Sequence, residues 1–250
     1  MNAALAAPML FALCALTPAQ VHSASFTPNP VAPGQSVTMT VTDATGFGCN
    51  LSSPCGWYRI HQGSQTGPQI SLGLFCPQVI VPVPPNGTFS FTWDQRDDTG
   101  ALVPPGVYWV EVRTLDVPLS AFRSDWFCIS IQPATAPALT ATGPVRIGQV
   151  TPIQVSAPSE PGAIYLTAVG FSANAPIVLP GLDICMAAPL YLDFVVAPIG
   201  ALDLAGQSSG LAIVLPNAPV GIWQALHVQT LLSGPSGLVV TNSLTFTIQP

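Results

Sequence analysis

The sequence predicts an all-β protein built from two tandem antiparallel β-sandwiches, and three observations support this prediction. Apolar and polar residues alternate with a period of two in several segments. Proline and glycine interrupt almost every candidate helix, and a stretch rich in proline and alanine divides the chain near its middle. Period-two alternation is typical of strands that bury one face, whereas amphipathic helices repeat every 3.6 residues. We therefore expect no helix after the N-terminal segment.

Four segments show the alternation most clearly, and their apolar members are expected to face a core. They are Val37, Met39 and Val41; Phe89 and Phe91 before Trp93; Tyr108, Val110 and Val112; and Leu244, Phe246 and Ile248. Trp109 breaks the polar series between Tyr108 and Val110. Because successive side chains in a strand point to opposite faces, this position favours exposure of one of the two rings.

The stretch from Gln132 to Ala138 reads as an extended linker between two halves of roughly 110 residues each, the size of an immunoglobulin-like (Ig-like) sandwich. We predict a signal peptide at 1–23, a first sandwich at 24–133, a linker at 134–137 and a second sandwich at 138–250. Short segments recur in the same order in both halves, including 30–35 with 144–149 and 131–133 with 248–250. These echoes favour a diverged internal repeat over chance similarity of β-rich sequences.

The composition excludes several classes of function. Apolar residues make up 49% of the 250 residues and charged residues only 6%, against roughly 25% in ordinary soluble domains. Lysine is absent and the formal net charge is −6, so nucleic acid and anionic membranes are poor partners. No apolar stretch of about 20 residues follows the N-terminus, so we predict no transmembrane segment in the mature chain.

The N-terminal segment resembles an export signal. Ala3 to Leu16 is apolar but too short to span a bilayer, and Val21-His22-Ser23 offers a small-residue cleavage site before Ala24. The alternative is a buried N-terminal strand. We expect an exported bacterial protein, either secreted or held in the cell envelope.

Export implies an oxidising compartment, where cysteines form disulfides. Five cysteines would remain after cleavage. We predict that Cys49 pairs with Cys55 across a short turn-prone loop, and that Cys76 pairs with Cys128. Cys185 would then be a buried free thiol. A zinc site is disfavoured, because the cysteines form no C-x-x-C spacing and the nearest histidine, His61, lies on a strand-like run.

The most informative segment runs from Trp93 to Tyr108. Asp97, Asp98 and Gly100 suit a turn in which carboxylate oxygens accept bonds from backbone amides and glycine takes a positive φ. Pro105-Gly106 fits the centre of a type II turn, and Tyr108 could bond back to a nearby loop. The aspartates could instead bind calcium, but turn capping is the favoured interpretation.

This segment resembles a W-D-x-x-D-x-x-G-x-x-V-x-x-G-x-Y signature shared by two bacterial Ig-like families, the intracellular proteinase inhibitors and the Ig-like domain of flagellar hook-capping proteins. The matching residues include Trp93, Asp94, Asp97, Gly100, Gly106 and Tyr108. The resemblance implies an Ig-like framework for the first half. The second half lacks the Trp-Asp pair and looks like β modules at the C-termini of predicted secreted bacterial proteins.

No catalytic constellation is recognisable, and no cofactor is expected. Gly206-Gln207-Ser208-Ser209-Gly210 matches a hydrolase elbow, yet no Asp or Glu follows Asp203 and His227 is a lone imidazole on a strand. A hairpin turn is the favoured interpretation. We predict a non-enzymatic binding, adhesion or envelope-structural module whose partner is an unidentified protein or glycan. An exported protease inhibitor is the alternative, and a carbohydrate-binding module with stacking tryptophans such as Trp57 is a third.

Overall fold

The computed structural model describes residues 22–43, 46–51, 58–72, 80–116, 122–173, 176–177, 182, 184–186, 188–217 and 224–250. Within these ranges every regular element is a β-strand and the strand pairs are antiparallel, which confirms the all-β prediction. No helix in the described part of the chain is long and apolar enough to cross a membrane.

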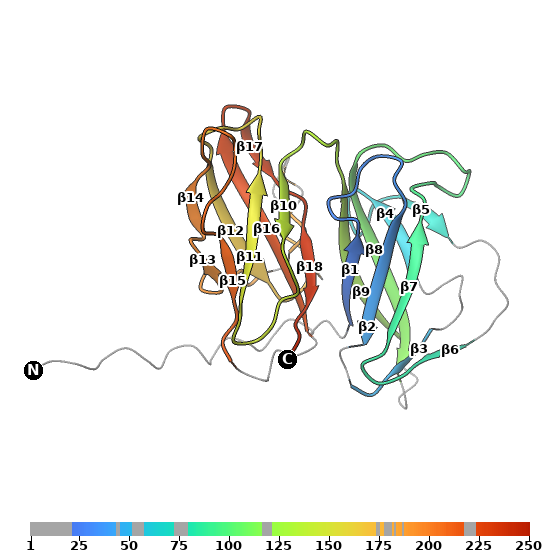
Figure 1. Ribbon diagram of the computed structural model, residues 1–250. Coiled ribbons are helices and arrows are strands. Elements are labelled where there is room, and N and C mark those ends of the chain that lie inside the picture. The colour runs from blue at the N-terminus through green and yellow to red at the C-terminus, as the bar shows by residue number, and fades with distance from the viewer. Residues whose placement is uncertain are drawn as a thin grey trace, which may run out of the picture.

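The first half of the chain forms two sheets (Figure 1). A three-stranded sheet has the order β1 (His22–Thr27), β2 (Val37–Asp43), β7 (Thr88–Trp93). A six-stranded sheet contains β3 (Cys49–Leu51), β4 (Tyr58–Gln62), β5 (Gln69–Leu72), β6 (Val81–Val83), β8 (Gly106–Asp116) and β9 (Phe122–Ile131). Strand β8 is the centre of the larger sheet, since it pairs with β9 along one side and with β4 and β3 along the other.

One apolar core lies between these two sheets. Its buried members include Val37, Met39 and Val41 from β2, Trp93 from β7, Tyr108, Val110 and Val112 from β8, and Phe127, Ile129 and Ile131 from β9. The inward positions are those expected from the alternation in β2 and β8, while Phe89 and Phe91 pack at the border of the core. Burial of these side chains is the main stabilising contribution to the half.

The second half also forms two sheets around a separate core. The four-stranded sheet has the order β10 (Ala138–Ala141), β11 (Val150–Ser156), β15 (Ala212–Val214), β13 (Val195–Val196). The five-stranded sheet joins β14 (Ile199–Ala201), β12 (Ile164–Gly170), β16 (Ala225–Gly234) and β17 (Gly237–Val240), and β18 (Leu244–Thr247) also pairs with β16. The core residues of this half all fall between Leu139 and Ile248. The predicted strand at Leu244 and Phe246 is confirmed as β18.

The first strand starts before the predicted domain boundary at residue 24. His22 and Ser23 are fully buried and pair with Asp43 and Thr42 of β2. Cleavage before Ala24 would remove two ladder positions of β1. The described part of the first sheet therefore includes His22 and Ser23, and the cleavage position before Ala24 stays a prediction.

Two of the echoed segments adopt the same arrangement in both halves. The backbone N–H of Gln132 donates to the carbonyl of Val31 at 2.9 Å, and the N–H of Gln249 donates to the carbonyl of Val145 at 2.9 Å. Gly34 and Gly148, three residues further on, both have positive φ, 75° and 66°. In each half the segment before the second strand is thus tied to the end of the last strand. The other echoes involve residues outside the described ranges, and the internal repeat stays a prediction.

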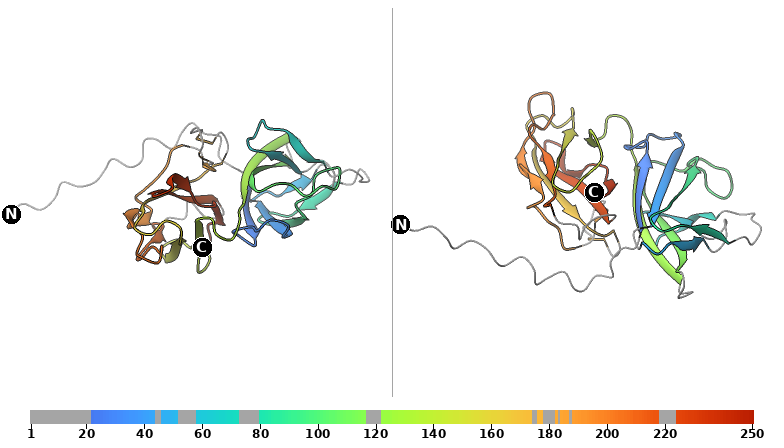
Figure 2. Two further views of the ribbon diagram at one scale, coloured as in Figure 1. Left: turned by 90° about the horizontal axis from the view of Figure 1, so that it is seen from above. Right: turned by 60° about the horizontal axis from the view of Figure 1, so that its bottom comes forward.

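The two halves lie side by side, and β1 of the first half contacts β18 and β16 of the second (Figures 1 and 2). The segment between β9 and β10 bends in a turn in which the N–H of Ala136 donates to the carbonyl of Pro133. The expected linker thus leads directly from one half into a neighbour that touches it.

Candidate functional site

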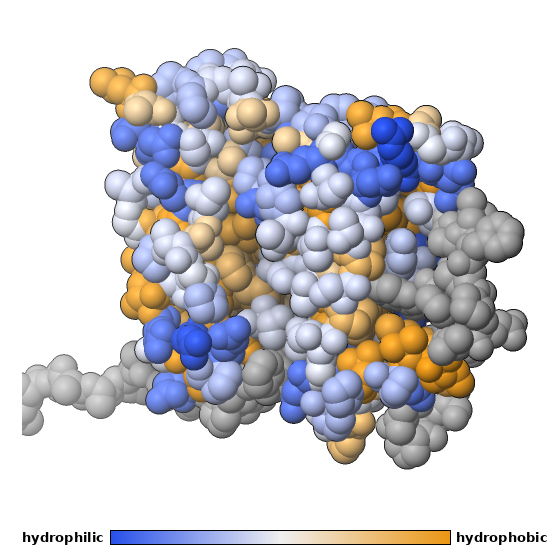
Figure 3. Space-filling view, turned by 45° about the vertical axis from the view of Figure 1, so that its right-hand side comes forward, coloured by the Kyte–Doolittle hydropathy of each residue, from blue (hydrophilic) through white to orange (hydrophobic). Residues whose placement is uncertain are grey.

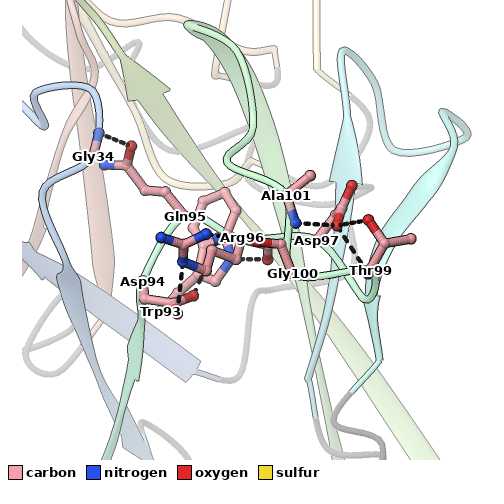
Figure 4. Close-up of polar contacts among 9 residues, drawn as sticks. All are labelled: Gly34, Trp93, Asp94, Gln95, Arg96, Asp97, Thr99, Gly100 and Ala101. Carbon is pink, nitrogen blue, oxygen red and sulfur yellow. Dashed lines mark hydrogen bonds and ion pairs between the residues drawn. The ribbon is translucent and has the colours of Figure 1, made fainter.

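The segment from Trp93 to Tyr108 forms a capped turn and not an open carboxylate cluster (Figure 4). Asp97 Oδ1 accepts bonds from the backbone N–H of Thr99 at 2.9 Å, from the Thr99 hydroxyl at 2.6 Å and from the N–H of Ala101 at 3.0 Å. The Thr99 hydroxyl, together with these backbone donors, holds the pKa of Asp97 below its usual 3.8. Gly100 has a φ of 84°, as expected. The favoured interpretation of Asp97 and Gly100 as turn residues is confirmed.

Asp94 and Arg96 extend this turn at the surface. Asp94 Oδ1 accepts the N–H of Arg96 at 3.1 Å, and the two side chains form an ion pair at 3.7 Å. Arg96 also donates to the carbonyl of Gly100 at 2.6 Å. Both side chains are largely exposed, so this pair contributes little to stability.

Gln95 is the residue of this segment that sequence reasoning missed. It is fully buried and has a φ of 61°. Its side chain reaches the loop between β1 and β2, where it accepts from the N–H of Gly34 at 2.7 Å (Figure 4). It also donates to the carbonyls of Ala32 at 2.7 Å and Gln35 at 2.6 Å. No pattern in the sequence distinguishes this glutamine from a surface residue, because its partners lie about 60 positions away.

Trp93 and Tyr108 close the motif inside the core. Their rings meet edge to face with centroids 5.3 Å apart, and Trp93 Nε1 donates to the carbonyl of Arg96. The Tyr108 hydroxyl donates to the carbonyl of Pro104, which is the expected bond back to a nearby loop. Burial raises the pKa of Tyr108 above 10.0, so the hydroxyl keeps this proton. Gly106, expected at a turn centre, instead begins β8 with a φ of 154° and pairs with Ile131.

The outward face of β8 and β9 is covered by the second half. Val107, Trp109 and Cys128 are buried there against Ala173 and Cys185. Trp109 is 3% exposed and Tyr108 is 0% exposed, so the expectation that one of these rings is exposed is wrong. Alternation placed Trp109 on the outward face correctly, but that face is a contact between the halves.

A disulfide joins the halves at this contact. Cys128 on β9 is bonded to Cys185, with 5.6 Å between their Cα atoms. The predicted free thiol at Cys185 and the predicted Cys76–Cys128 bond are therefore both wrong. The physical reason is that Cys128 lies on the outward face of β9, where it packs against Ala173 and Cys185 of the other half. Cys49 is buried at the start of β3, while Cys55 and Cys76 lie outside the described residues, so the Cys49–Cys55 pairing stays a prediction.

Polar contacts continue the junction along β1. Ser23 Oγ lies 2.6 Å from the hydroxyl of Thr247 on β18. Asn29 accepts from the Asn242 amide at 2.8 Å and donates to the carbonyl of Ser243 at 2.9 Å. Such part-buried bonds stabilise one relative placement of the halves, since a different placement would break them.

Two histidines are buried beside these contacts. His22 donates through its backbone N–H to Asp125 Oδ2 at 2.9 Å, and its Nδ1 lies 2.6 Å from the same oxygen. His227 on β16 lies 3.1 Å from the hydroxyl of Thr245. Burial lowers the pKa of His227 to about 4, so its imidazole is neutral at physiological pH. Both groups are closed off from solvent, which suits a structural role better than acid–base chemistry.

The hydrolase-like segment is also a turn. Gly206 has a φ of 73°, and Ser208 is buried with its Oγ accepting the backbone N–H of Val155 at 2.8 Å. The segment connects β14 to β15, which belong to different sheets, so it is a turn as expected but not a hairpin. In the described part of the chain, no three His, Cys, Asp or Glu side chains are grouped to hold a metal ion.

Comparisons with known proteins give only distant similarities. No family model matches the chain, and no curated protein matches it. Among solved structures, the CupB2 chaperone of Pseudomonas aeruginosa has a TM-score of 0.31 and 12% identity, covering 89% of this chain and 99% of that one. Fibronectin(III)-like modules of CbhA from Clostridium thermocellum have a TM-score of 0.23 and 10% identity, covering 90% and 93%. Elastase-activated alpha-2-macroglobulin of Escherichia coli has a TM-score of 0.27 and 11% identity, and the match covers 88% of this chain and 22% of that one. At these scores the similarities carry no argument about function.

Proposed function

We propose that this chain is an exported, non-enzymatic module in which two tandem Ig-like sandwiches act as one rigid body for binding, adhesion or envelope structure. The observation that carries the proposal is the Cys128–Cys185 disulfide, which joins the outward faces of the two halves. A covalent link at an already buried, hydrogen-bonded contact favours a body that holds its faces in a constant relation. Such a bond persists in oxidising compartments.

The Ig-like part of the proposal rests on how the strands alternate between sheets. In the first half, β2 lies in the three-stranded sheet, β4 in the larger one, β7 in the smaller again, and β8 and β9 in the larger. In the second half, β11, β12, β15 and β16 alternate in the same way. Alternation of this kind, with a buried tyrosine bonded to a nearby loop, is typical of Ig-like sandwiches.

Peptide mapping of natively exported protein tests the proposal. Under non-reducing conditions we expect one peptide pair that joins Cys128 to Cys185. The intact pair should disappear after reduction. Protein that remains in the cytoplasm with Met1 intact and with both cysteines as free thiols would overturn the proposal.

The same experiment locates the processed N-terminus. Because His22 and Ser23 are buried in β1, we propose that cleavage occurs upstream of His22, after Ala19. Thr17-Pro18-Ala19 offers small residues upstream. Intact mass should show a chain that retains His22 and Ser23. An N-terminus at Ala24 would contradict this placement without affecting the disulfide.

The partner class is open to direct test. A glycan array and a panel of proteases, both probed with the disulfide-bonded protein, separate the glycan-binding and inhibitor alternatives from a protein-binding role. The glycan alternative is weakened by the burial of Trp109, which removes one stacking platform. Unchanged protease activity at micromolar protein would end the inhibitor alternative.

A further inference from the structure

The outward face of the five-stranded sheet carries a row of aliphatic side chains that faces solvent. Ile199, Leu166, Leu231 and Val240 lie opposite one another on β14, β12, β16 and β17. A second row beside it contains Ala201, Ile164, Ser233 and Leu238 in the same strand order. We call these eight residues the apolar face; none of them is charged.

Exposure of this face is high for aliphatic residues. Ile164 is 60% exposed, Ile199 61%, Leu238 50% and Leu166 37%. Exposed aliphatic side chains gathered on one sheet face form a candidate interaction surface.

The apolar face continues a surface that already has a partner. Further along the same side of the sheet, Ala168, His227 and Gln229 are buried. Gln229 Oε1 accepts the N–H of Cys185 at 3.0 Å, in the segment bonded to the first half. On the same side of the sheet, Thr247 of β18 meets Ser23 of the first half, so the first half covers one part of this side and the exposed part begins at Leu166.

A face of the first half shows the contrast. On the outward side of β1, β2 and β7, every position in three cross-strand rows is serine or threonine: Thr27, Thr38 and Thr92; Ser25, Thr40 and Ser90; Ser23, Thr42 and Thr88. Pairs of these hydroxyls bond each other, Thr38 to Thr92 and Thr40 to Ser90, both at 2.9 Å. Figure 3 shows pale, weakly polar surface over β2 and β7. Ser23 and Thr42 are buried, but the exposed hydroxyls of this face, including Thr88, Ser90 and Thr92, form hydrogen bonds with water, which the aliphatic side chains of the apolar face do not.

We propose that the apolar face is the contact between two copies of this chain, related by a two-fold axis. A two-fold contact places the same patch of both copies together, and sheet faces pack through interdigitated aliphatic rows. Each copy has a net charge of −6, so a self-contact requires a face without charge, which the apolar face provides. Nucleic acid and acidic surfaces offer it nothing, because it contains no cation.

The size of the face predicts a reversible dimer. Four adjacent strands span roughly 14 Å between the outer two, and two rows along each strand add about 7 Å. The Cα positions of the face thus outline only about 100 Å², and with their side chains a few hundred Å² per copy, which is below the roughly 800 Å² per partner of a standard interface. We therefore expect a weak dimer with a dissociation constant of roughly 0.1–1 mM.

Sedimentation velocity on the complete, disulfide-bonded protein tests the proposal from low micromolar to near-millimolar concentration. The wild-type weight-average mass should rise toward twice that of the monomer. The double variant Ile164→Glu, Ile199→Glu should raise the dissociation constant at least tenfold, because it places two charges on each side of the contact. Leu238→Glu, on β17 opposite Ser233, gives an independent variant of the same face.

Matched control variants distinguish the effect of changing the apolar face from the effect of adding negative charge anywhere on the protein. Thr88→Glu with Thr92→Glu adds the same charge to the hydroxyl face and should leave the dissociation constant within about twofold, since exposed charges far from a contact are screened. Ile164→Gln with Ile199→Gln should weaken the dimer without adding charge. A wild type that stays monomeric throughout, or Ile164→Glu, Ile199→Glu and Leu238→Glu variants that dimerise like the wild type, would overturn the proposal. Circular dichroism verifies that each variant is folded.

Discussion

Two five-residue turns, one in each half, have the same hydrogen-bond pattern although they lie in different connections. In the first, Asp97 Oδ1 accepts from the N–H of Thr99 and Ala101, and in the second Asp203 Oδ1 accepts from Ala205 at 2.8 Å and Gln207 at 2.9 Å. The N–H of Gly100 donates to the carbonyl of Asp97, as that of Gly206 does to Asp203. The two glycines have φ values of 84° and 73°.

The turns differ in where they sit and what they touch. The first follows β7 and precedes β8, while the second lies between β14 and β15. A Cβ on Gly100 would meet no atom within 4 Å, whereas a Cβ on Gly206 would lie 2.2 Å from the carbonyl oxygen of Ala157. The comparison shows that the sequence D-x-x-G-x forms this turn by itself, while its tertiary setting decides how much each residue contributes to stability.

Substitution of the two glycines by alanine should give the largest difference in unfolding free energy between the two turns. Gly100→Ala meets only the strain of a positive φ, so we expect a loss of about 1–2 kcal/mol in unfolding free energy. Gly206→Ala adds a clash with backbone and should lose about 3–5 kcal/mol. Chemical denaturation of both variants measures the difference, and equal losses would show that Gly206 is not packed as described.

The second-largest difference is expected for the two side chains, Gln95 and Ser208, that hydrogen-bond the segment of each turn to another part of its own half. Gln95→Ala removes three part-buried bonds to the loop of Ala32, Gly34 and Gln35, and we expect a loss of about 2–3 kcal/mol because the loop loses the side chain that ties its backbone groups together. Ser208→Ala removes one bond, from the N–H of Val155, and should lose about 1 kcal/mol. Denaturant midpoints at constant slope test the ranking; a larger loss for Ser208→Ala would reverse it.

The capping carboxylates should be equivalent. Asp97→Ala and Asp203→Ala each remove two bonds from backbone N–H groups in the same geometry, so the two variants should lose similar amounts of unfolding free energy. Asn at either position retains an acceptor oxygen and is the control that should recover part of the loss. Losses that differ by more than about 1 kcal/mol would mean that the shared pattern does not reflect shared energetics.

The smallest effect lies in the one bond that the second turn lacks. Thr99 donates its hydroxyl to Asp97, and the matching position in the other turn is Ala205. We expect Thr99→Ala to raise the pKa of Asp97 toward 3.8, because that hydroxyl is the main cause of its lowering. Asp97 stabilises the fold while ionised, so this contribution is present above the unfolded pKa and is lost as pH falls through the folded one. NMR titration of the Asp97 carboxyl measures the change; an unmoved pKa would contradict the assigned cause.

Local patterns predicted much of the fold. The strands of Val37, Tyr108 and Leu244 follow from period-two alternation, which depends only on one face being buried. The Asp97 turn and the Tyr108 bond follow from short motifs whose partners lie within four residues. Gln95, by contrast, could not be found, since nothing near it in the chain marks its burial.

The sequence by itself determined that this chain is all-β, which faces of its best-patterned strands point inward, and that Asp97 and Gly100 form a turn. Each of these depends on neighbours within a few residues. Tertiary structure decided that Trp109 is buried, that Cys128 bonds Cys185 across 57 positions, and that His22 belongs to the first strand. The reason is that these outcomes depend on contacts between residues far apart in the sequence. The residue pattern of one strand indicates which side is apolar, but it does not indicate which other element packs against that side.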